Sequence, residues 1–369
     1  MIDVITSQNR EKWNNYVELS GIRDLYYTWE YSRMFELNGD GEARLFVYSR
    51  DGKLVIYPYL LRSVRNLPAF RALSLDREYY DIITPYGYGG PAIHCADPEE
   101  RMEIMKNFAV AFAGYCAEND IVAELVRYHP LLKNHEYNTH LFNRHVKNTI
   151  YVDLRPDYKQ IVANYTSECR NRIRKASKHL SVTIQRSGDF KRFRELYELT
   201  MNRLKADSYY YFSEPFFSFL GSGAMSDVIR LVEIFHDDQL IVSAVFLCYG
   251  NTIHYFLLGS DSQYWELAPN NLVFDSIINW GKMNGYQFLH LGAGHRKDDG
   301  LYRFKKSFNK NGMLEYYFGQ KIHNQAVYSL LEEHVQKMSG LPVLDDHAFF
   351  PSYRNPVFHG NVDQEERTS

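Results

Sequence analysis

The chain has 369 residues and a formal net charge of −3, with 45% hydrophobic and 24% charged residues. This length exceeds what one hydrophobic core usually serves, so we expect two domains of a globular protein. The slightly negative charge argues against a protein built wholly around nucleic acid, although it allows a local basic patch. No apolar run reaches the roughly eighteen residues that would span a bilayer.

The N-terminus and the cysteines bear on compartment and metal content. Residues Met1 to Thr6 lack the basic and apolar pattern of a signal peptide, so a cytoplasmic location is expected. The four cysteines lie far apart, without a C-x-x-C pair or histidines at metal-ligand spacing. We therefore expect free thiols and no metal site.

Two hairpin patterns recur along the chain at a constant spacing. In the first, apolar runs flank a turn at Asp51-Gly52, and in the second they flank Asp237-Asp238. Leu45 and Leu54 of the first copy correspond to residues that lie 186 positions later, Leu231 and Leu240. The spacing indicates an internal duplication.

Each hairpin is followed by a loop, a helix and a strand. These are expected at residues 84–91, 97–118 and 121–126 in the first half, and at 259–269, 271–283 and 286–291 in the second. Closing strands are expected at 149–152 and 313–318, and further helices at 156–179, 189–205 and 324–338. The order predicts an α/β (α+β) fold of two tandem domains, 1–150 and 151–320, each with a mixed central sheet flanked by helices. Residues 321–369 form a C-terminal helix and tail, expected to pack on the first domain.

The stretch from Tyr286 to Phe308 carries the strongest chemical signal. A buried strand ends in Gly292-Ala293-Gly294, where backbone groups can approach a ligand closely, and Lys305 and Lys306 follow. Positive charge beside such a turn suits an anion or a developing oxyanion. The pattern favours acyl-transfer or phosphate chemistry.

A basic run ends the helix predicted over 156–179. Its cations could bind the phosphates of a nucleotide, tRNA or CoA, or could form a solvated face that complements the negative helix end. The residues concerned are Arg172, Arg174, Lys175 and Lys178.

Aromatic residues gather in two segments. The run after Arg203 suits a sugar or peptide ligand, and a Gly-rich loop can bend sharply around a ligand or be an ordinary sheet-edge connection. Arg203 is followed by Tyr209 and Tyr211, while Tyr86 and Tyr88 occupy a Gly-rich loop. The chain has 30 tyrosines, so ordinary packing explains such clusters equally well. Asp81, at the start of that loop, could orient or deprotonate an attacking amine.

Asn270 and Asn271 come directly before a predicted helix, where free N–H groups can hold a phosphate or polarise a carbonyl. A capping role alone would also explain them. The absence of G-x-S-x-G, H-E-x-x-H, Walker and G-x-G-x-x-G motifs removes support for triad hydrolysis, zinc proteolysis and dinucleotide redox chemistry.

The duplicated plan, the basic helix end from Arg172 to Lys178, and the Phe304-Lys305 step together resemble the Fem family of aminoacyl-tRNA-dependent peptidyltransferases. More broadly, they resemble the tandem-domain branch of the GNAT acyltransferases. The resemblance implies two GNAT-like domains, a cytoplasmic acyl donor, and an acceptor amine on a peptidoglycan-type precursor of the cell envelope. No tightly bound cofactor is implied, because aminoacyl-tRNA or acyl-CoA serves as a co-substrate.

The resemblance also implies roles for single residues. Lys305 would stabilise charge at the transferred carbonyl, and Phe304 would wall the channel. Arg203 and the tyrosines after it would grip the diphosphate-sugar of the acceptor, and the basic helix end would face the donor phosphates.

Two departures from the family pattern leave the acceptor and the donor open. The chain reads Gly89-Gly90-Pro91 where peptidoglycan-directed members often have Arg-Gly-Pro, and no long helical hairpin fits between Pro156 and Lys205. We therefore carry three hypotheses: an aminoacyl transferase, a CoA-dependent N-acyltransferase of an amino sugar or small amine, and a binding module without catalytic activity.

Overall fold

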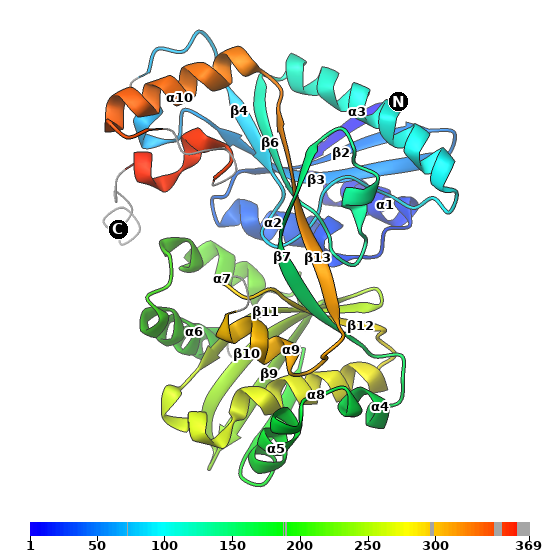
Figure 1. Ribbon diagram of the computed structural model, residues 1–369, viewed down its shortest axis with the longest axis vertical. Coiled ribbons are helices and arrows are strands. Elements are labelled where there is room, and N and C mark those ends of the chain that lie inside the picture. Colours follow the sequence, from blue (N-terminus) through cyan, green and yellow to red (C-terminus); the bar gives the residue numbers. More distant parts are fainter. Residues whose placement is uncertain (72, 187, 189, 296–298, 343–348, 360–369) are drawn as a thin grey trace. The chain divides into compact units, whose positions relative to one another are not determined.

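The computed structural model describes residues 1–71, 73–186, 188, 190–295, 299–342 and 349–359 (Figure 1). The chain divides into two compact units. The first comprises Met1–Ile22, Tyr26–Val146 and Tyr316–Ser369, and the second comprises Arg23–Leu25 and Lys147–Glu315. The C-terminal tail from residue 360 and the loop residues 296–298 lie outside the described part of the chain.

The sheet of the first unit has the strand order β1-β2-β3-β4-β6-β13, with β5 beside β3. Its strands are β1 (Ile2–Thr6), β2 (Glu42–Arg50), β3 (Lys53–Ser63), β4 (Tyr80–Ile83), β5 (Ala92–Ile93) and β6 (Ile121–Arg127), completed by part of β13 (Met313–Ile322). Its helices are α1 (Arg10–Ser20), α2 (Trp29–Leu37), α3 (Pro98–Glu118) and α10 (Gln325–Ser339), with short 3-10 turns η1 (Leu25–Tyr27), η2 (Pro68–Phe70), η3 (Asn134–Glu136), η6 (Ser352–Arg354) and η7 (Pro356–Phe358).

An aromatic core fixes α3 on this sheet. Phe108 and Phe112 of α3 stack on each other and contact Phe46 of β2 and Tyr57 of β3, all of them buried. The helix begins at Pro98 because Asp97 accepts hydrogen bonds from the first free N–H groups.

The second unit repeats the same strand order. The sheet runs β8-β9-β10-β11-β12-β7, from β8 (Ser181–Gln185) through β9 (Ile229–His236), β10 (Gln239–Tyr249), β11 (Thr252–Ser260) and β12 (Phe288–Gly292) to part of β7 (Phe142–Asp153). Its helices are α4 (Tyr158–Ala163), α5 (Ser167–Ala176), α6 (Phe190–Leu204), α7 (Glu214–Leu220), α8 (Pro269–Met283) and α9 (Gly300–Lys306), with η4 (Ser208–Tyr210) and η5 (Ser262–Leu267).

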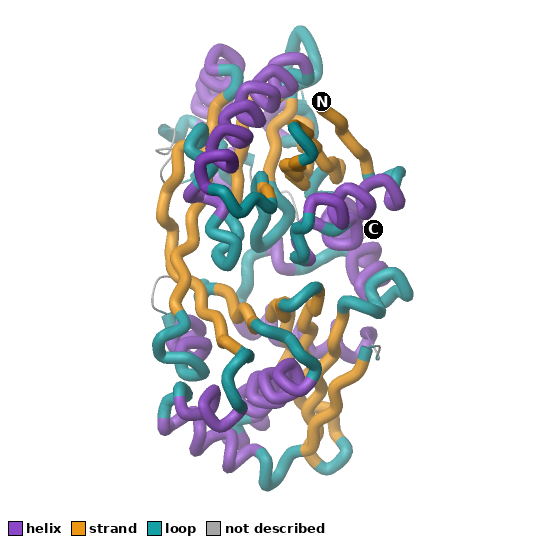
Figure 2. The backbone as a smooth tube through the Cα atoms, turned by 90° about the vertical axis from the view of Figure 1, so that its right-hand side faces the viewer, coloured by secondary structure: helices purple, strands orange, loops and turns teal. Residues whose placement is uncertain are grey.

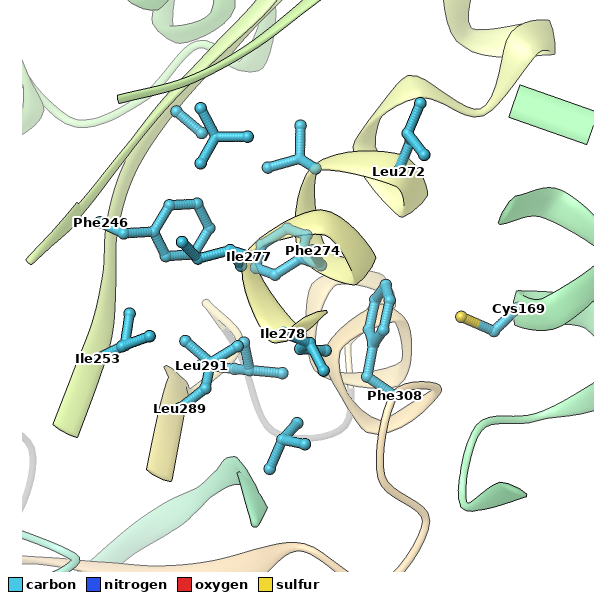
Figure 3. Close-up of a cluster of buried hydrophobic side chains, with 14 of the residues drawn as sticks. Cys169, Phe246, Ile253, Leu272, Phe274, Ile277, Ile278, Leu289, Leu291 and Phe308 are labelled. Carbon is cyan, nitrogen blue, oxygen red and sulfur yellow. The ribbon is translucent and has the colours of Figure 1, made fainter. Parts of the chain in front are cut away.

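The core of the second unit lies between its sheet and α8. Phe246 of β10 and Phe308 contact Phe274 of α8, and Cys169 of α5 lies in the same cluster (Figure 3). On the other face α6 approaches so closely that a Cβ on Gly259 would lie 2.3 Å from the backbone nitrogen of Tyr197. Each unit is therefore a mixed sheet with helices packed on it (Figure 2).

The duplicated hairpins are confirmed. β2 pairs with β3, and β9 pairs with β10, through tight turns. Asp51 and Gly52 have φ of 51° and 75°, and Asp237 and Asp238 have φ of 46° and 64°. Two consecutive positive φ values give the twist that joins antiparallel strands most directly, and Gly, Asp and Asn tolerate them best. The predicted α/β class and the internal duplication therefore stand.

The closing strands differ from expectation. We expected each half to complete its own sheet, but Phe318–Ile322 of β13 pairs with β6 of the first unit, and β7 pairs with β12 of the second unit through Ile150–Asp153. The last strands of the two halves are thus exchanged. The observed units differ from the expected ranges 1–150 and 151–320 because the two closing strands are exchanged. An apolar pattern predicts a strand but not the strand with which it pairs.

One local feature also differs from the sequence prediction. The helix expected over 156–179 is broken into α4 and α5, because Thr166 caps a new start by accepting a hydrogen bond from the Cys169 N–H. The C-terminal segment, which was expected to pack on the first domain, belongs to the first unit, where Tyr353 and Arg354 of η6 contact Asp81 of β4.

Candidate functional site

The two parallel strands β11 and β12 separate within the second unit. They pair only over Thr252–His254 and Phe288–His290, although β11 continues to Ser260. Just beyond these pairs a bulge at Phe256 shifts the register of β11 against β10, and such bulges bend a strand. Past the bulge the backbone groups of β11 therefore have no partner from β12, which leaves room for a ligand's polar groups.

The corresponding strands of the first unit stay joined. β4 pairs with β6 up to Ile83 and Leu125, and the next residue, Thr84, donates its N–H to Leu125 O at 3.3 Å. Arg127 N–H then donates to Thr84 Oγ1 at 3.1 Å, and a bridge joins Gly89 to Tyr128. The separation found in the second unit has no counterpart here.

Lys305 stands beside the separated strands. It lies on α9, which begins where Asp299 accepts a hydrogen bond from the Tyr302 N–H. Its ammonium is buried, donates to Ala293 O at 2.6 Å, and lies 5.0 Å from the centre of the Tyr255 ring on β11. Burial, with a smaller contribution from the Lys147 charge, lowers the pKa of Lys305 to about 7, against the opposing effect of Asp299.

A second lysine holds the same turn. Lys147 Nζ donates to Gly294 O at 3.0 Å and to His295 O at 3.5 Å, and burial lowers its pKa. A Cβ on Gly294 would lie 2.2 Å from Asp299 Oδ1, so only glycine fits this turn without a shift. Two cations thus hold carbonyl groups after β12, where the sequence led us to expect approach by backbone N–H groups.

Comparison with known proteins shows to which domain family these strands belong. Residues 163–306 match the family model of the acetyltransferase (GNAT) domain. The second unit is a GNAT acyltransferase domain. The chain is therefore an acyltransferase, and the expected relation to the GNAT enzymes is confirmed. A search of curated proteins gives no match to the sequence.

Solved structures support the tandem fold. FemX matches with a TM-score of 0.64 and 15% identity, over 89% of this chain and 99% of FemX. The C-terminal domain of a putative lysylphosphatidylglycerol synthetase from Agrobacterium fabrum matches with a TM-score of 0.50 and 14% identity, over 89% of this chain and 96% of the other. A protein of unknown function from Bacteroides thetaiotaomicron matches at 0.52 and 11%, over 87% and 99% of the two chains. At such identities these matches show the fold alone.

Phe304, the neighbour of Lys305, packs into the core of the GNAT domain. Its ring lies 5.4 Å from Phe274 and 5.4 Å from Phe308. It fixes α9 on α8 and thereby supports the position of Lys305. Its predicted role as a channel wall stays a prediction.

Asn270 and Asn271 open α8 of the GNAT domain. Asn271 is buried, and its side-chain amide donates to Cys169 Sγ at 3.6 Å, while its N–H donates to Ala268 O at 3.1 Å. Ala268 N–H donates to Trp265 O, and Pro269 has no N–H to offer. The start of this helix therefore presents fewer N–H groups to a phosphate than the sequence suggested.

The basic residues of the predicted donor patch are exposed on and just after α5, a helix that packs beside α8. Arg172 pairs with Glu168 at 3.0 Å, and Arg174 donates to Asn171 Oδ1 at 3.3 Å. Lys175 and Lys178 make no ion pair with the described residues. Of the four cations, three therefore make no ion pair within the described part of the chain, and only Arg172 does.

Arg203, near the end of α6, contacts the end of β11, where the strands have separated. Its guanidinium donates to Ser260 O at 3.0 Å and lies 4.6 Å from the centre of the Trp265 ring, which is half exposed. Tyr211 OH donates to Asn202 Oδ1 at 2.8 Å on α6, and Tyr209 packs against Phe212. These residues are placed on one end of the GNAT domain.

The tyrosines of the Gly-rich loop belong to the first unit. Tyr88 is buried against Tyr26 and Tyr316, and burial raises its pKa. Tyr86 lies half-buried beside Phe35. Their surroundings are those of packing residues.

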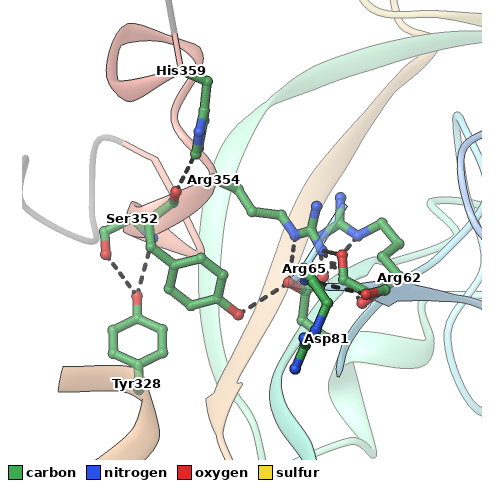
Figure 4. Close-up of polar contacts among 9 residues, drawn as sticks. Arg62, Arg65, Asp81, Tyr328, Ser352, Arg354 and His359 are labelled. Atoms are coloured by element: carbon green, nitrogen blue, oxygen red, sulfur yellow. Dashed lines mark hydrogen bonds and ion pairs between the residues drawn. The ribbon is translucent and has the colours of Figure 1, made fainter. Parts of the chain in front are cut away.

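Asp81 also belongs to the first unit, and its carboxylate is fully occupied (Figure 4). Arg62 Nε donates to it at 2.7 Å, Tyr353 OH donates at 3.0 Å, and Arg354 forms an ion pair with it. Burial raises the pKa of Asp81, but the guanidinium groups of Arg354 and Arg62 lower it by more. The pKa of this carboxyl therefore lies below its ordinary value. A carboxylate held in this way is a weak base, so the structure gives Asp81 a structural function and no free oxygen for an amine.

Sequence reasoning missed a buried polar network at the point where β11 and β12 part. His254 Nε2 lies 3.1 Å from Asp24 Oδ2, and His290 Nε2 lies 3.0 Å from Thr149 Oγ1. The two imidazole rings are 5.7 Å apart. Lys147 was missed for the same reason: partners more than a hundred residues apart leave no local signal in the sequence.

Proposed function

We propose that the chain transfers an aminoacyl group from aminoacyl-tRNA to an amine of a peptidoglycan-type precursor of the cell envelope. The amine nitrogen attacks the ester carbonyl, a tetrahedral oxyanion forms, and the ester oxygen leaves with a proton that originates on the amine. The observation that carries the proposal is the buried ammonium of Lys305 beside the separated strands of a GNAT domain. A cation preorganised in a dry site stabilises the developing oxyanion more than the neutral carbonyl.

The surroundings of α8 favour tRNA as the donor. The N–H groups of Ala268 and Asn271 are in use and Pro269 has none, so this helix start is poorly suited to a CoA pyrophosphate. The exposed cations of α5 lie beside α8 and suit the more extended phosphate chain of an RNA. The match to an acetyltransferase model keeps a CoA-dependent N-acyltransferase as the second candidate.

The acceptor assignment rests on the resemblance to the Fem family and on Arg203. This guanidinium is anchored to Ser260 at the end of β11, next to the strand segment that lacks a partner in β12. Arginine in such a fixed position suits the diphosphate of a nucleotide-linked or lipid-linked sugar.

The test compares donors and a matched pair of lysine variants. We would incubate the protein with charged tRNA or acetyl-CoA and a panel of precursor amines, and follow the mass gained by the acceptor. Lys305→Ala should lower turnover by about a hundredfold with little change in substrate binding. Lys306→Ala, one position further on the same helix, should keep normal turnover.

Each outcome separates the hypotheses. Product with acetyl-CoA alone would replace the proposal by the second candidate. Precursor binding without product from either donor would indicate a binding module. If Lys305→Ala weakens substrate binding but keeps normal turnover, this lysine is a phosphate ligand. That result would contradict its role at the oxyanion.

A further inference from the structure

A cavity lies at the opposite end of the GNAT domain from Lys305. Lys305 stands past the point where β11 and β12 part, whereas this cavity lies at the end of the sheet where β9 and β12 begin and α8 ends. Its volume is about 420 Å³, and it is lined mainly by polar and aromatic side chains: Gln185, Arg186, Arg230, Trp280, Asn284 and Tyr286.

Arg230 is the chemically unusual residue of this cavity. It is only 6% exposed, yet it pairs with no carboxylate of the described residues. Its Nη1 donates to Asp227 O at 3.2 Å and to Ile229 O, and its guanidinium carbon lies 5.1 Å from the centre of the Trp280 ring. These contacts fix the group but use only Nη1, so Nε and Nη2 have no hydrogen-bond partner in the described part of the chain.

Arg186 adds a second cation next to it. Leu231 pairs with Gln185 across β8 and β9, which places Arg186 and Arg230 at neighbouring positions on the two strands. Arg186 makes a long contact of 3.8 Å with Asp227, whose side chain is 90% exposed. A surface contact of this kind is weak and leaves Arg186 available.

The remaining wall supplies an aromatic surface and further polar groups. Trp280 and Tyr286 stack with ring centres 5.6 Å apart. The amide of Asn284 donates to Trp280 O, and the amide of Gln185 donates to Glu233 at 2.8 Å. Among the described residues, the carboxylates of Glu233 and Asp227 contact this wall, Glu233 through Gln185 and Asp227 through Arg186.

We propose that this cavity binds the phosphoryl group of a small phosphomonoester, with Arg230 and Arg186 as its ligands. Planar guanidinium groups bind phosphate oxygens through paired charge-assisted hydrogen bonds, and a buried arginine without a carboxylate is a costly group unless an anion neutralises it. The volume exceeds that of a phosphate ion, so the organic part of the ligand would lie along Tyr286 and Asn284. The proposal is independent of the transfer reaction at Lys305.

The test is calorimetric titration of the full chain with inorganic phosphate at constant ionic strength, with chloride as the balancing ion. Saturable binding is expected, and Arg186→Gln and Arg230→Gln should each weaken it by about tenfold or more. The control variant is Lys159→Gln, which removes an exposed positive charge on α4. It should bind phosphate as tightly as the native chain does. Circular dichroism checks that each variant is folded, and Arg186→Gln decides the question if Arg230→Gln does not fold.

A second series identifies the source of the phosphoryl group. A sugar phosphate and a nucleoside 5′-monophosphate should bind more tightly than inorganic phosphate, and a short RNA without a terminal phosphate should not compete. Three results would overturn the proposal: no saturable binding of phosphate, equal weakening in Lys159→Gln and Arg186→Gln, or binding of the RNA alone.

Discussion

Burial of Lys305 leads to a quantitative prediction about stability. In the unfolded chain this lysine has an ordinary pKa of 10.5, and in the folded chain burial lowers the pKa to about 7. The unfolded state therefore binds the proton more tightly, and the stability of the folded chain rises with pH between these two values. A difference of roughly 3.5 pH units corresponds to about 5 kcal/mol, or about 1.4 kcal/mol for each pH unit within the window.

The assay compares the native chain with Lys305→Met by urea denaturation at pH 7.5 and pH 9.5. Because the other titrating groups are shared, they cancel in the difference between the two proteins. The native chain should gain roughly 2 to 3 kcal/mol relative to the variant over these two pH units. A difference that stays constant with pH would show that Lys305 keeps its ordinary pKa, and the reasoning that places a buried ammonium at this site would be refuted.

Three further predictions concern other parts of the chain. Asp81→Asn should destabilise the first unit by about 3 to 5 kcal/mol, because it leaves two guanidinium groups without their carboxylate; an unchanged urea midpoint would contradict this. Replacing Arg172, Arg174 and Lys175 by glutamate should weaken donor binding. The slope of log affinity against log salt concentration should fall by roughly one unit for each phosphate that the variant no longer neutralises. Unchanged donor affinity would show that these residues only form a solvated helix face. Gly259→Ala should cost about 1 to 3 kcal/mol, because the new Cβ meets the backbone of α6; a melting temperature equal to that of the native chain would show that α6 can move away.

No helix of the described residues has the length and apolar character needed to cross a bilayer. The aminoacyl donor, the envelope acceptor and the location in the cytoplasm stay predictions.

The sequence by itself determined the local elements and their repetition. The turns at Asp51-Gly52 and Asp237-Asp238, and the helix start after Asp97, depend on neighbours within a few residues, so their patterns could be read directly. The Phe304-Lys305 step, two adjacent residues, likewise indicated the GNAT relationship through its resemblance to the Fem family. The turns and the helix start are decided by short-range hydrogen bonding and by allowed backbone angles.

Only the tertiary structure decided which segments meet. β7 and β13 are exchanged between the two units, Asp81 is occupied by Arg354 from near the other end of the chain, and Lys147 joins Lys305 at one turn. The pKa of Lys305 is likewise a result of burial that no local pattern records. These properties depend on strand pairing, desolvation and charge contacts between residues far apart in the sequence, and their free energies are settled only when the whole chain packs.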